Sequence, residues 1–66
     1  MVDQARRNMI LNMNKVQLEF TRSMARDKLY FARQRNFSEY QQEQEQVIDL
    51  CNSLLNGIEN RAVVHA

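Results

Sequence analysis

The chain has no proline and no tryptophan, and among its 66 residues it has one glycine, one cysteine and one histidine. A single cysteine excludes an intramolecular disulfide, and Cys51 with His65 cannot supply the four ligands of a structural zinc site. A chain of this length predicts one domain, spanning residues 1–66, with a small hydrophobic core. Because disulfide and metal support are both absent, we expect association with another chain to stabilise it.

Motifs of catalysis, secretion and membrane insertion are also missing. The sequence contains no Gly-rich phosphate loop, no Gly-x-Ser-x-Gly and no His-Glu-x-x-His. Its apolar runs are short, such as Met9-Ile10-Leu11, and no apolar h-region follows the charged start. We therefore expect a non-enzymatic cytoplasmic protein that needs no cofactor and no metal, binds no small-molecule substrate and does not insert into a membrane.

Good helix formers fill two long stretches that are separated by a short polar segment. In this segment Asn36 can adopt the left-handed conformation that ends a helix. Ser38 and Gln41 have the spacing of a capping box, which begins the next helix. A single unbroken helix is the competing interpretation. The predicted elements are a first helix over about 4–34, a turn over about 35–38 and a second helix over about 39–60.

The second predicted helix carries one apolar seam. Its seam positions alternate in steps of three and four residues, which is the heptad spacing of a helix packed along another helix. Gln44 is the only polar member of this seam, and Cys51 is interpreted as a small buried hydrophobe. The seam residues are Phe37, Tyr40, Gln44, Val47, Cys51, Leu54 and Ile58.

The first predicted helix carries two apolar faces on opposite sides. One face is assigned to the seam with the second helix and comprises Val2, Met9, Met13, Val16, Phe20, Met24 and Phe31. The other comprises Leu11, Leu18, Ala25, Leu29 and Ala32. A two-helix hairpin needs only one face, so we expect the second to bind a partner chain through Leu11, Leu18, Ala25 and Leu29. The predicted fold is an all-α, coiled-coil-like antiparallel hairpin completed by dimerisation or by a partner protein.

Closing this hairpin about Arg35 and Asn36 places Asp27 level with Gln44. The two side chains are interpreted as a polar layer that sets the register. The alternative is that each side chain reaches water near the turn.

Charge is divided between the two halves of the chain. Residues 1–36 contain eight Lys and Arg against three Asp and Glu, whereas residues 37–66 contain one against five. This division favours antiparallel pairing, with Arg26 level with Glu45 and Arg22 level with Asp49. One side of the first helix also carries a row of four cations that could contact RNA phosphates. The row consists of Lys15, Arg22, Arg26 and Arg33.

The basic first helix, the short turn and the sequence Glu39-Tyr40-Gln41-Gln42 at the start of the second helix resemble the small co-chaperones of type III secretion needle subunits. In that family a Tyr-Gln pair often opens the second helix of a hairpin, and Leu50, Leu54 and Leu55 fall at its apolar positions. The resemblance covers residues 15–58. It implies a cytoplasmic protein that joins a helical-repeat chaperone and keeps the needle subunit monomeric before export.

Two functions from different classes follow from these patterns. The first is a small adaptor or co-chaperone that binds a partner protein through the second apolar face. The alternative is a homodimeric four-helix bundle that binds structured RNA through the basic row. A protein that masks a regulatory factor is not separable from the first by sequence.

Overall fold

The computed structural model describes the backbone of residues 3–64 and the side chains of residues 3–59, and this part of the chain is all-helical. It contains α1 (Gln4–Leu11), α2 (Lys15–Arg35) and α3 (Ser38–Val64). The all-α class is therefore confirmed. The predicted continuous helix over 4–34 is wrong, because the chain breaks into two helices at residues 12–14.

Asparagine side chains cause this break. Asn12 closes α1, where its Nδ2 donates to the Asn8 carbonyl at 2.9 Å. Asn14 begins α2 with a capping box: its Oδ1 accepts from the Gln17 backbone N–H at 2.9 Å, and the Gln17 Oε1 accepts from the Asn14 N–H at 3.0 Å. These side chains satisfy backbone groups at the end of α1 and at the start of α2, which lowers the free-energy cost of ending one helix and beginning the next here.

The connection between α2 and α3 is shorter than predicted. Asn36 has φ 58° and ψ 36°, so the prediction that it ends the helix in the left-handed conformation is confirmed. The Phe37 N–H donates to the Ala32 carbonyl at 3.0 Å and the Asn36 N–H to the Arg33 carbonyl at 3.4 Å, which is a Schellman arrangement. The Phe37 carbonyl accepts from the Gln41 N–H at 2.8 Å, which is the first helical hydrogen bond at the start of α3. Phe37 therefore holds the cap position predicted for Ser38, which is the first residue of α3.

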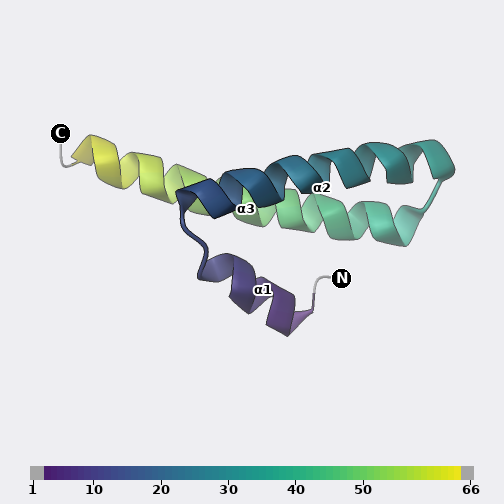
Figure 1. The fold of residues 1–66 in the computed structure, drawn as a ribbon, viewed down its shortest axis with the longest axis horizontal. Coiled ribbons are helices and arrows are strands. Elements are labelled where there is room, and N and C mark those ends of the chain that lie inside the picture. The colour runs from purple at the N-terminus through teal and green to yellow at the C-terminus, as the bar shows by residue number, and fades with distance from the viewer. Residues whose placement is uncertain (1–2, 65–66) are drawn as a thin grey trace.

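Figure 1 shows α2 and α3 lying side by side in opposite directions, with α3 continuing past the start of α2. α1 folds back beside the pair and contacts α3. The molecule is elongated, with principal extents of 45, 23 and 14 Å. One core cluster joins all three helices, and it consists of Ile10, Leu18, Ala25, Val47, Cys51 and Leu55.

The two apolar faces of α2 are reversed relative to the sequence-based assignment. Leu18, Ala25 and Leu29, predicted to bind a partner, are buried in the molecule together with Ala32. Val16, Phe20 and Phe31, predicted to pack in the seam, are 74%, 65% and 58% exposed. Tyr40, another predicted seam residue, is 40% exposed, and Leu11 is the one predicted partner residue that lies outside.

A charge explains this reversal. Asp27 lies within about 40° of both Phe20 and Phe31 on the wheel of α2, so packing that face against α3 would bury a carboxylate. The opposite face carries only leucine and alanine at its centre, and the small Ala25 and Ala32 allow close approach of α3. The uncharged face is therefore the one that becomes the core.

Along α3, Val47 and Cys51 are fully buried, and Leu54 and Ile58 are half-buried against the core. Met13 also packs against it from the α1–α2 connection. The predicted polar layer is wrong: Gln44 is buried, but Asp27 is exposed on the far side of α2. Within the described residues the Gln44 Oε1 has no hydrogen-bond partner.

Candidate functional site

The face of α2 directed away from the core is exposed and largely apolar, with Asp27 lying among its apolar residues. Phe20 and Phe31 lie three turns apart on it, with Met24 between them at 42% exposure. Single exposed apolar residues are ordinary on a protein surface, but several large ones along one face of a helix mark an interaction site or an association hazard. This stripe is the most distinctive surface among the residues that the structure describes.

The first part of the stripe borders a groove between α1 and α2. Its volume is about 240 Å³, and Met9 and Met13 face Phe20 and Met24 across it. The Thr21 hydroxyl donates to the Met13 sulfur at 3.3 Å, which holds that side chain on the α2 side of the connection. The buried Ala25 lines the bottom of the groove.

The second part of the stripe lies at the turn. A groove of about 310 Å³ is lined there by Phe31, Phe37 and Tyr40, with Ala32 buried beneath them. The Arg35 guanidinium lies 5.1 Å from the centre of the Phe31 ring, a cation–π contact that holds its charge at the rim. Lys28 lines both sections, so they form one continuous surface. We call this surface the α2 groove, and its members are Arg6, Met9, Met13, Phe20, Met24, Asp27, Lys28, Phe31, Arg35, Phe37 and Tyr40.

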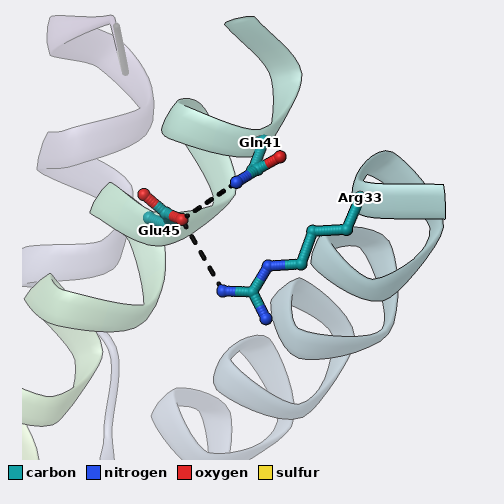
Figure 2. Close-up of polar contacts among 3 residues, drawn as sticks. All are labelled: Arg33, Gln41 and Glu45. Atoms are coloured by element: carbon teal, nitrogen blue, oxygen red, sulfur yellow. Dashed lines mark hydrogen bonds and ion pairs between the residues drawn. The ribbon is translucent and has the colours of Figure 1, made fainter. Parts of the chain in front are cut away.

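The basic row on the other side of α2 is partly engaged with α3. Arg22 Nη1 donates to Asn52 Oδ1 at 3.0 Å, and Arg33 lies 3.7 Å from the Glu45 carboxylate. Figure 2 shows Glu45 between Arg33 and Gln41, whose side-chain amide donates to it at 3.4 Å. The predicted pairs of Arg26 with Glu45 and of Arg22 with Asp49 are therefore not the ones formed.

These contacts affect the RNA hypothesis. Arg33 is largely exposed and Glu45 is partly exposed, so the ion pair between them contributes little to stability. The contacts of Arg22 and Arg33 nevertheless direct two of the four cations of the basic row toward α3 rather than toward solvent. Lys15 and Arg26 are exposed on the same side of α2. Two outward-facing cations are few for the recognition of a phosphate backbone.

Residues with chemical reactivity are few in this part of the chain. Burial raises the pKa of the Cys51 thiol, and the nearby Arg22 and Arg6 only partly oppose this effect. A buried protonated thiol is a poor nucleophile. Within residues 3–59 no group of His, Cys, Asp and Glu side chains is arranged to hold a metal ion. His65 lies outside the described residues.

No helix in the described part of the chain combines the length and the apolar character that crossing a bilayer requires.

Comparisons with known proteins give no relative. No protein-family model matches the chain, and neither a curated protein nor a solved structure matches it.

Sequence reasoning assigned most members of the α2 groove to the buried seam. The signal that distinguishes the faces is Asp27, whose charge interrupts the aromatic stripe but not the Leu18 face. A second missed signal is the Asn14–Gln17 spacing, which separates α1 from α2 and so creates the wall formed by Met9 and Met13.

Proposed function

We propose that this chain is a non-enzymatic protein-association module, a small adaptor or co-chaperone, that binds a partner protein through the α2 groove. The observation that carries the proposal is the exposure of Phe20, Met24 and Phe31 on the face of α2 opposite the core. Covering this stripe removes apolar surface from water and gives the driving force for association. The same binding would complete the small core of the α2–α3 hairpin.

The resemblance to type III secretion needle co-chaperones supports this class of function. It rests on Tyr40 and Gln41 at the start of α3 and on the basic helix before the turn. A cytoplasmic adaptor of that kind binds its partner chain by helix packing and needs no catalytic residues. Tyr40 lies in the α2 groove, so the residue that carries the resemblance also belongs to the proposed surface.

The proposal moves the partner-binding surface from the Leu18 face to the Phe20 face. Leu18, Ala25 and Leu29 are buried inside the molecule and are needed for folding. Phe20 and Phe31 are exposed, so polar substitutions there leave the helices intact.

The test compares capture of a partner by three forms of the tagged full-length chain in extracts of the source cells. The doubly substituted form Phe20→Asp/Phe31→Asp should lose the partner that the unchanged chain retains. The control Tyr30→Asp changes an aromatic residue next to Phe31 with a similar exposure of 64% that does not line the groove. Circular dichroism verifies that all three are equally helical. Equal capture by the Phe20→Asp/Phe31→Asp form would contradict the proposal.

A further inference from the structure

We infer that the occupant of the α2 groove is an amphipathic helix of a different protein, whose apolar stripe is flanked by Asp and Glu side chains. This inference rests on the proposed function and specifies the chemistry of the partner. Three features of the described residues lead to it: the length of the groove, the charge of its lining and the clustering of methionines.

The length of the groove fits one helix. Phe20 and Phe31 are separated by eleven positions, which correspond to about 16 Å along α2, or three turns. α1 borders one end through Met9 and Met13, and Phe37 and Tyr40 border the other. The buried alanines at 25 and 32 form the bottom of the two sections. A helix presenting apolar side chains at positions i, i+3 or i+4, and i+7 matches such a groove.

The charged residues lining the groove are mainly cationic. Arg6, Lys28 and Arg35 contribute positive charge, and Asp27 is the only acidic residue among the lining residues. Lys28 lies where the two sections meet, and Arg35 is held over Phe31 by its ring contact. A helix with acidic residues beside its apolar stripe would place carboxylates against these cations and would be preferred over one with basic residues.

A second copy of the chain is a poor occupant. In a two-fold dimer across this surface the same patch meets itself, so two surfaces with the same excess of positive charge would be brought together. The lining of the groove has three cations, Arg6, Lys28 and Arg35, against the single carboxylate of Asp27, so self-pairing is electrostatically unfavourable. The acidic helix α3 of a second copy cannot serve instead, because its apolar residues Val47, Cys51 and Leu55 are already buried in the core.

Methionines line one section of the groove. Met9, Met13 and Met24 are three of the four methionines in the chain. Their flexible, polarisable side chains adapt to apolar groups of different shape. The groove should therefore discriminate by the charge flanking the stripe more than by the identity of the apolar residues within it.

The test uses two fluorescent synthetic helices of 18 residues with identical leucine stripes, one flanked by Glu and one by Lys. Fluorescence anisotropy measures their binding to the full chain at low and high salt. We expect the Glu-flanked helix to bind about tenfold more tightly at low salt, with the preference shrinking as salt rises. Lys28→Glu/Arg35→Glu should abolish the preference. Lys28→Glu alone should reduce it and serves if the double variant loses helicity.

The control is Lys15→Glu/Arg26→Glu, which makes the same change in net charge outside the groove and should preserve the preference. Equal binding of both helices, or equal loss in the control, would overturn the inference and leave association through the groove intact. A concentration-dependent dimer abolished by Phe31→Asp would also overturn it, since a second copy would then occupy the groove. A monomeric chain that binds neither helix would overturn both the inference and the proposed function.

Discussion

The Arg22 guanidinium of α2 donates a 3.0 Å hydrogen bond to the side-chain oxygen of Asn52 on α3. Both side chains are half-buried, and the two residues are 30 positions apart in the sequence. Charge complementarity alone favoured Asp49, an anion, as the partner of Arg22. The observed partner is a neutral amide almost one turn further along α3, so packing of the core rather than charge pairing sets the register of the two helices.

Replacing Asn52 by alanine should lower the free energy of unfolding by about 1 kcal/mol, because a half-buried hydrogen bond to a charged group is lost. Asp49→Ala should have an effect within about 0.5 kcal/mol, since Asp49 is exposed. Urea denaturation of both variants measures the difference. A larger loss for Asp49→Ala would indicate that the helices pair in the register predicted from charge.

The reversed faces of α2 predict opposite sensitivities at two neighbouring positions. Leu18→Ala should cost about 2–5 kcal/mol, because Leu18 is 1% exposed and its removal leaves a cavity in the core. In a domain this small such a loss unfolds much of the population. Phe20→Ala should cost less than about 1 kcal/mol, since Phe20 is 65% exposed. Thermal unfolding followed by circular dichroism compares the two, and a greater loss for Phe20→Ala would restore the original assignment of faces.

Gln44 is buried at 3% exposure, and its Oε1 has no hydrogen-bond partner among the described residues. Gln44→Met keeps the length of the side chain and removes the unsatisfied group, so it should raise the free energy of unfolding by about 1 kcal/mol. Gln42→Met, two positions away and exposed, provides the control and should change stability little. A destabilised Gln44→Met variant in urea denaturation would show that the amide makes a favourable polar contact.

Cys51 should make stability fall on the alkaline side. Burial raises the pKa of its thiol, so the folded chain holds this proton more tightly than the unfolded chain does. The corresponding stability is fully present below the pKa of the unfolded thiol and is lost as pH rises toward the folded value. Denaturation from pH 7 to above about 9 should show a decrease in stability that is smaller in Cys51→Ala, which lacks the thiol. Identical pH dependence in the two proteins would contradict the prediction.

Local sequence patterns were sufficient for the helical class, for the helix end at Asn36 and for the central seam positions Gln44, Val47 and Cys51, whereas the predicted seam residues Phe37 and Tyr40 are exposed. Helix propensity, the left-handed preference of asparagine and heptad spacing act within a few residues of one another, so they can be read without knowing the partner helix. The Asn14–Gln17 cap is local in the same sense. The apolar periodicity of residues 4–34 continues across residues 12–14, so it favours one continuous helix and hides this cap.

Tertiary packing decided which face of α2 becomes the core, and with it the location of the candidate site. Both faces have enough apolar residues to pack against α3, so periodicity could not choose between them. The choice depends on the cost of burying Asp27 and on the close approach that Ala25 and Ala32 permit, and both depend on the helix placed opposite. The α2 groove is likewise formed only in the tertiary structure, because the packing of α1 and the turn before α3 bring Met9 and Tyr40 to opposite ends of one stripe.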